Sequence, residues 1–310
     1  MSDWPIPWAP VAGNRAGALA WLESVLAEGT LGGLARLPAR GQDAIVGLLA
    51  RTARRVDPRH TQAAREFIAQ ALPALDANAR EALVLQSWRY FLTLLLRNVA
   101  FDRHVPLATR SAHYELELCP AARDIFDRRT PCIVVTAHVG DFEAGAALFP
   151  ALGFRHAYAV VRPPRNRPLS LSTQRLREGR GYRVIHRRGA WADIAKIAAA
   201  GGSVMLLLDQ RPHGKAVVAP FFGRPAPCER GAAVLLRRLE LPVLIGACYT
   251  TDVPYRYRMV FPTALAPGEL SGASPEAIVT RVNAEMESLI LRHPEQYFWL
   301  HDRFRDVPAR

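Results

Sequence analysis

The sequence predicts an α/β fold, in which a mostly parallel mixed sheet is flanked by helices and preceded by a helical N-terminal region. Over the first hundred residues, apolar side chains recur at helical spacing. From Pro131 onward, short apolar runs alternate with helical stretches, which is typical of a parallel sheet covered on both faces. The 310 residues are 50% hydrophobic and 22% charged, so a large core can form without disulfides.

The N-terminal region is expected to contain four helices. Asn14 is a candidate N-cap for the first, whose apolar stripe includes Leu19, Leu22 and Val25. The last is very apolar in its second half, which is typical of a buried core helix or of a membrane-docking face. We expect residues 1–105 to form a helical region that packs on an α/β body formed by residues 106–310, so that the two parts make one continuous domain. The expected helices cover residues 14–29, 41–54, 61–72 and 78–99.

The remaining elements alternate along the body, without repeats or a clear linker. Residues 221–231 are expected to form a turn and the start of a helix. Strands are expected at residues 132–136, 157–161, 183–186, 203–208, 217–222, 243–249 and 255–260. Helices are expected at residues 141–148, 169–179, 190–200, 229–239 and 275–291.

The charge balance favours anionic partners. The net charge is +12, and only Lys196 and Lys215 are lysines, so 38 of the 40 basic residues are arginine. Two explanations fit that ratio. One is a GC-rich genome, which prefers arginine codons, and the other is an arginine-lined surface that binds phosphate or carboxylate groups bidentately. The positive field suits lipid headgroups, nucleic acid or an acidic carrier protein. Since neither a helix-turn-helix signature nor an aromatic-basic RNA motif is present, nucleic acid is not the expected partner.

The sequence indicates a cytoplasmic protein with peripheral membrane contact. Four cysteines without a CxxC pair do not suggest a disulfide framework or a metal knuckle. The N-terminus has an acidic third residue and three prolines in a short apolar run, unlike a signal peptide. The longest uncharged run, Ile197 to Leu208, is too short to span a bilayer.

The segment from His138 to Glu143 carries the most chemical information. His138 follows the first predicted strand, and in an open α/β sheet ligands bind beyond the carboxyl ends of the strands. Gly140 permits a tight turn, after which Asp141 and Glu143 fall in the first turn of a helix. A carboxylate can hold the histidine in one tautomer and let it accept a proton from a hydroxyl. The same pattern also suits a structural histidine.

Other chemistries fit the sequence less well. His138, Asp141 and Glu143 offer metal ligands, but no HExxH motif or second nearby histidine accompanies them, so no metal is expected. The chain has no G-x-S-x-G elbow, phosphate loop or dinucleotide fingerprint, and no cofactor is expected.

Three more segments fall where a site belongs. Arg162 follows the second strand, and its guanidinium suits a phosphate or a developing oxyanion. Asp209 and Gln210 follow the strand over residues 203–208. For Arg162 and Asp209, an ion pair between strand ends is an equal alternative to a functional role. Arg230 stands at the start of the helix after residues 221–229.

Together these segments resemble the bacterial lipid A biosynthesis acyltransferases, which add secondary acyl chains to Kdo-lipid A. The resemblance extends in order from Arg65 to Phe304 and implies a glycerolipid acyltransferase-like fold. The similar segments are REFIAQALP (residues 65–73), HVGDFE with its HX4E motif (138–143), VRPPRN (161–166), LLLDQ followed by APFFGRPA (206–226), and HPEQYFWLHDRF (293–304).

The resemblance implies that His138 is the general base and that Glu143 orients and stabilises it, with Asp141 as the alternative partner. No covalent enzyme intermediate is needed. Arg162 would stabilise the oxyanion or a headgroup phosphate. The substrate-binding or oxyanion residues it implies are Arg162, Asn166, Asp209 and Gln210. Further candidates are Asp141, Arg230, and the pair His301 and Arg303, which would form either part of the site wall or a packing clasp.

The implied donor is an acyl carrier protein or acyl-CoA, and the implied acceptor is a lipid A precursor or related glycolipid. An ornithine-type lipid or a carrier-bound polyene is an alternative acceptor, and a catalytically silent lipid-binding relative is an alternative function. Members of the family commonly begin with a transmembrane helix, which this sequence does not show. We therefore expect a peripheral protein on the cytoplasmic side of the inner membrane, held at an anionic surface.

Overall fold

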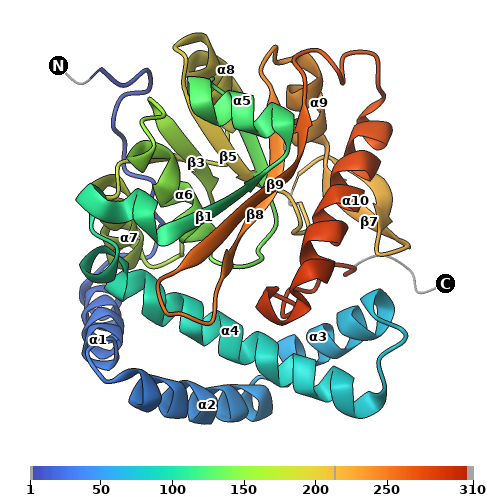
Figure 1. Cartoon of the computed structure of the whole chain (residues 1–310). Helices are drawn as coiled ribbons and strands as arrows, with labels where there is room; N and C mark the ends of the chain where they lie inside the picture. The colour runs from blue at the N-terminus through green and yellow to red at the C-terminus, as the bar shows by residue number, and fades with distance from the viewer. Residues whose placement is uncertain (1–2, 213, 306–310) are drawn as a thin grey trace.

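A computed structural model of the chain describes residues 3–212 and 214–305. It confirms an α/β fold with a mostly parallel sheet between helices and a helical N-terminus (Figure 1). The α-helices are α1 (Ala18–Leu34), α2 (Ala39–Val56), α3 (Pro58–Ala71), α4 (Ala77–His104), α5 (Pro120–Arg128), α6 (Phe142–Ala151), α7 (Arg167–Gly179), α8 (Ala190–Ala199), α9 (Arg230–Arg238) and α10 (Pro275–Arg292). Two short 3-10 helices are η1 (Leu107–His113) and η2 (Pro294–Gln296).

The main sheet has seven strands in the order β1-β9-β8-β2-β5-β3-β4. Its neighbours pair in parallel except β8 and β9, which are antiparallel. β6 and β7 form a separate antiparallel pair. The strands are β1 (Tyr114–Leu118), β2 (Ile133–Thr136), β3 (Ala157–Val161), β4 (Arg183–His186), β5 (Ser203–Leu207), β6 (Ala216–Phe221), β7 (Arg224–Glu229), β8 (Val243–Thr250) and β9 (Tyr257–Leu265).

Both faces of the sheet are buried. Successive side chains of a strand point to opposite faces. In β2, Ile133 and Val135 therefore join the core beneath α8, α9 and α10, whereas Val134 joins the core beneath α5 and α6. This two-sided burial explains why the central strands are continuous apolar runs in the sequence.

α4 lies along one side of the sheet and packs against α1, α2 and α3, as Figure 1 shows. Its apolar second half packs on the core through Tyr90, Leu96 and Phe101, which are buried, whereas Leu95 and Val99 are exposed. None of the described helices is long and apolar enough to cross a bilayer. The domain boundary expected after residue 105 stays a prediction.

Several expected boundaries were wrong. α1 begins at Ala18 with Gly17 at its N-cap, so Asn14 does not cap it. Residues 224–229 form strand β7, because Phe222 and Gly223 both adopt positive φ angles that suit a two-residue hairpin turn. The edge strand β1 and the helix α5 were not expected. β1 alternates apolar and acidic residues, and its three central residues are exposed, as suits a strand at the edge of the sheet.

Candidate active site

His138 and Asp209 meet because their strands are neighbours. β2 and β5 pair in parallel, so their carboxyl ends lie side by side at one edge of the sheet. His138 Nδ1 lies 2.7 Å from Asp209 Oδ1. The backbone N–H of His138 donates to the other carboxylate oxygen at 3.1 Å. One buried carboxylate therefore fixes both the backbone and the ring of His138.

The turn after His138 depends on Gly140. This glycine has a φ of 63°, and a Cβ atom there would lie 2.0 Å from the carbonyl oxygen of Cys248. The Tyr90 hydroxyl donates to the carbonyl of Gly140 at 2.7 Å and to that of His138 at 3.3 Å. Tyr90 of α4 therefore holds the turn through these two carbonyl groups, which fixes the backbone at and after the histidine.

The ring of His138 is oriented for proton transfer. A carboxylate only accepts hydrogen bonds, so in the neutral ring Nδ1 carries the proton and Nε2 keeps its lone pair. The ring packs at centroid distances of 5.1 Å from Phe142 and 6.4 Å from Phe298. The side chain is 23% exposed and lines the main cavity. This arrangement leaves Nε2 as the nitrogen available to a bound hydroxyl.

The carboxylate of Asp209 stays ionised. Burial alone would raise its pKa, but the charge and hydrogen bonds of His138 outweigh burial and lower it. His301 lies near this pair. The negative charge of Asp209 raises the pKa of His301, whereas the charge of His138 lowers it. Burial lowers the pKa of His301 to about 4, so this imidazole is neutral at pH 7. Its Nε2 accepts a hydrogen bond from the backbone N–H of Arg211 at 3.0 Å.

Glu143 takes part in a different contact from the one implied by the resemblance. Its oxygens accept hydrogen bonds from Arg177 at 2.5 and 3.0 Å and from the Tyr182 hydroxyl at 2.7 Å. Burial would raise its pKa, but the charge and hydrogen bonds of Arg177, with the hydrogen bond of Tyr182, hold that pKa at about 2. Glu143 thus ties α6 to α7 beside the cavity, whereas the ring of His138 faces Asp209.

Asp141, the alternative partner, lies deeper. It is the N-cap of α6, and its Oδ1 accepts from the backbone N–H of Ala144 at 2.9 Å. Burial raises its pKa to about 6, although that hydrogen bond lowers it. Among the described residues, its Oδ2 and the hydroxyl of Tyr257 are buried without a hydrogen-bond partner. Asp141 therefore caps the helix at an electrostatic cost.

A cavity of about 1790 Å³ opens at this edge of the sheet. One part of it passes between α6 and the sheet and is lined by apolar side chains. Ala146 and Phe149 come from α6, while Val134, Ala159 and Met205 come from the facing strands. The Glu143–Arg177 pair forms a polar section of the same wall. A largely apolar channel next to His138 has the character of a site for a hydrocarbon chain.

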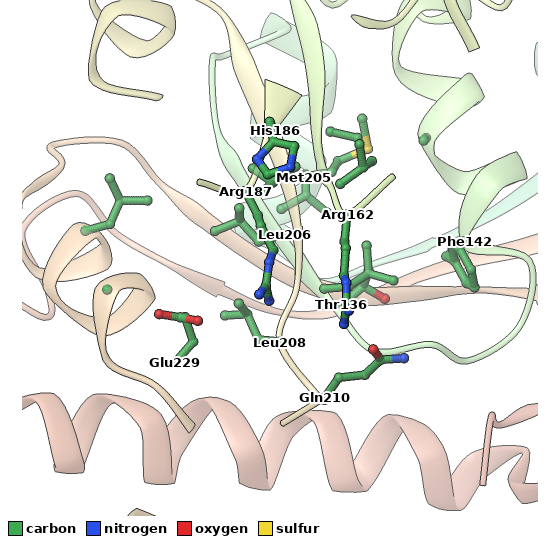
Figure 2. Close-up of a pocket in the computed structure, with 18 of the residues that line it drawn as sticks. Thr136, Phe142, Arg162, His186, Arg187, Met205, Leu206, Leu208, Gln210 and Glu229 are labelled. Atoms are coloured by element: carbon green, nitrogen blue, oxygen red, sulfur yellow. The ribbon is translucent and has the colours of Figure 1, made fainter. Parts of the chain in front are cut away.

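The mouth of the cavity is basic. Arg162 and Arg187 follow the paired strands β3 and β4, and Figure 2 shows both extending into the pocket, with Gln210 and Glu229 nearby. Burial and the charge of Arg162 lower the pKa of Arg187, while Glu229 opposes them. An anion bound here would relieve the repulsion between these cations. Besides Arg177, the arginine and lysine residues that line the cavity are Arg162, Arg165, Arg187, Arg188, Arg211, Lys215, Arg230, Arg237 and Arg238.

The remaining predicted residues separate into lining and supporting groups. Gln210 and Arg230 line the cavity. Asn166 caps α7 and donates to the carbonyl of Ala20 at 2.8 Å, which ties α7 to α1. Arg303 is buried, donates to the carbonyl of Pro227 and the sulfur of Cys228, and lies over the ring of Phe221. These contacts tie the C-terminal segment to β6 and β7, which is the packing role expected as one of two alternatives for Arg303.

Sequence reasoning missed five residues that shape the site. Arg177 and Tyr182 hold Glu143, and Tyr90 holds the turn after His138. No local pattern marks these residues, because they come from distant segments. Arg187 and Arg188 could have been found, since these two arginines directly follow the carboxyl end of the strand predicted over residues 183–186. The described residues contain no group of three or more His, Cys, Asp or Glu side chains that could hold a metal ion.

The site therefore combines an oriented histidine, an apolar channel and a basic mouth. The family model for bacterial lipid A biosynthesis acyltransferases matches residues 18–306, nearly the whole chain. No curated protein matches the chain. The family match and the order of segments from Arg65 to Phe304 agree. The chain belongs to the bacterial lipid A biosynthesis acyltransferase family and is an acyltransferase.

Proposed function

We propose that the protein transfers a fatty acyl chain from an acyl carrier protein or acyl-CoA to a hydroxyl of a lipid A precursor or related glycolipid. The observation that carries the proposal is the position of His138, at the cavity wall with Nδ1 on the buried carboxylate of Asp209. A hydroxyl near Nε2 and a thioester in the apolar channel would meet at this ring.

In the proposed reaction, Nε2 of His138 accepts the proton of the acceptor hydroxyl as its oxygen attacks the thioester carbonyl carbon. The carbonyl becomes a tetrahedral oxyanion, which Arg162 would stabilise. Its collapse breaks the carbon–sulfur bond, and the proton passes from His138 to the leaving sulfur. The products are an ester and a free thiol. The negative charge of Asp209 stabilises the imidazolium that forms in between.

The other parts of the cavity suit the two substrates. The donor chain would occupy the channel under α6, and the basic mouth would hold phosphate groups of the donor or of the glycolipid. Glu143 also belongs to the proposed site, because it is ionised, lines the cavity wall and positions Arg177. The Glu143–Arg177 pair has no net charge, so the electrostatic support of His138 falls mainly to Asp209. We place the enzyme on the cytoplasmic side of the inner membrane as a peripheral protein.

The test uses purified protein with acyl carrier protein and acyl-CoA donors, and mass spectrometry of the products. His138→Ala should reduce transfer by about 10² to 10⁴-fold, the usual contribution of a general base. His60→Ala, which removes a half-exposed histidine of α3, is the matched control and should keep full activity. Full transfer by His138→Ala would contradict the mechanism.

Lipid mass spectrometry of cells with and without the protein identifies the acceptor. Loss of one acyl chain from a lipid A species supports the proposal. A change confined to an ornithine-type lipid or a carrier-bound polyene would identify another acceptor. No change in any acylated species, together with no transfer in the purified assay, would indicate a catalytically silent lipid-binding protein.

A further inference from the structure

The first helix of the protein exposes an apolar face. Five large apolar side chains of α1 are 45–68% exposed: Leu19, Trp21, Leu22, Val25 and Leu26. At 100° per residue they share an arc of about 160° on the helix surface. A contiguous apolar face of this kind marks an interaction site in a folded protein.

The polar groups of α1 lie beside this face and are occupied within the protein. Glu23 accepts hydrogen bonds from Arg15 and from Asn166, and Glu28 accepts from Ser24 at 2.7 Å. Ala20 and Ser24 are buried on the inner side of the helix, which faces α4 and α7. The helix is therefore held to the body by one side and presents the other side to its surroundings.

The neighbouring helix adds positive charge. α2 follows α1 directly and exposes Leu48, Leu49 and Val56 together with Arg51 and Arg55. Exposed leucines interspersed with arginines suit a surface that is apolar inside and negatively charged outside, as an anionic bilayer is. An acidic protein would match the arginines but would not need the unbroken apolar arc of α1.

The exposed helix is continuous with the cavity. Ala12, Gly13 and Asn14, immediately before α1, line the cavity. The backbone of Arg15 is hydrogen bonded to that of Arg165 and Arg167 at the start of α7. A lipid in a bilayer that contacts α1 would thus have only a short distance to travel to the mouth.

We propose that α1, assisted by the exposed side of α2, lies in the headgroup region of an anionic phospholipid bilayer and places the cavity mouth beside it. The helix lies flat, since its 17 residues extend only about 25 Å and glutamates flank its apolar arc on either side. The proposal rests on the proposed function in one respect: a lipid substrate gives the protein a reason to bind a bilayer. Binding itself is independent of catalysis.

The test is co-sedimentation of the full chain with vesicles of phosphatidylcholine and phosphatidylglycerol in equal parts. Trp21→Ser combined with Leu22→Gln and Leu26→Gln should weaken binding by at least about tenfold, because a loss of 1.4 kcal/mol suffices for that factor. Val218→Gln with Val253→Gln changes side chains of similar exposure and should leave binding unchanged.

Two further measurements separate the possible outcomes. His138→Ala should bind vesicles like the wild type while losing activity. A wild type that binds vesicles but transfers no acyl chain would contradict the proposed reaction but not the docking surface. Equal binding by wild type and the α1 variant, or no binding by the wild type, would overturn the proposal. If wild type dimerises without lipid, the α1 variant stays monomeric and neither binds vesicles, the face joins two copies and the proposal is wrong.

Discussion

The Nδ1 atom of His138 lies 2.7 Å from Oδ1 of Asp209, a residue 71 positions later in the chain. The contact is possible because β2 and β5 are adjacent and parallel, so the residues just beyond their carboxyl ends converge. It makes Asp209 the carboxylate that sets the tautomer of the histidine. Glu143, five residues from His138, instead forms an ion pair with Arg177.

Asp209→Asn should lower kcat by about 10² to 10⁴-fold with a small effect on KM. The amide can present its N–H₂ group to Nδ1, which would move the ring proton to Nε2 and remove the base. Steady-state kinetics measure the loss, and ¹⁵N chemical shifts of the His138 ring report the tautomer. An active variant, or an unchanged tautomer in an inactive one, would show that Asp209 does not position the ring.

Glu143→Gln should lower the free energy of unfolding by about 3 to 5 kcal/mol, because it leaves the charge of Arg177 buried and unpaired. Chemical denaturation measures this change. Glu143→Gln combined with Arg177→Met removes both charges and should recover most of the stability. Recovery of activity in the double variant would make Glu143 a positioning residue of the cavity wall. A stable but inactive double variant would make its charge part of the reaction.

Asp141→Asn should stabilise the protein at pH 7.5. The pKa of Asp141 is raised by burial from 3.8 to about 6, so the folded state pays for an ionised carboxylate above pH 6. Since the folded state binds the proton more tightly, the stability of the wild type falls as pH rises from about 4 to about 6. The advantage of the variant is on the order of 3 kcal/mol at pH 7.5 and should shrink towards pH 4. Denaturation curves at both pH values check this; an advantage independent of pH would contradict it.

Ala146→Leu should shorten the preferred acyl chain. Ala146 lines the apolar channel from α6, and three additional carbons there would fill space that a bound chain needs. Competition between acyl donors of different length, analysed by mass spectrometry, measures the preference. Leu291→Gln, on the exposed side of α10, is a control for surface changes. An unchanged chain-length profile would place the donor chain elsewhere.

Much of the fold could be predicted from local patterns. The central strands are apolar runs because both faces of the sheet are buried, and the helices between them keep apolar stripes. The elements that escaped prediction are β1, α5 and β7, which are short or lie at edges. For β7, a strand containing two prolines gives little local signal.

The sequence by itself determined the order of most elements, the family and the location of the histidine at a strand end, because these depend on spacing along the chain. Only the tertiary structure decided which carboxylate faces His138. The spacing of the family's HX4E motif favoured Glu143, but α6 directs that side chain towards Arg177 of α7 and Tyr182, which hold it. Asp209 reaches the ring through the pairing of β2 with β5, and strand order in a sheet is a property of the whole fold.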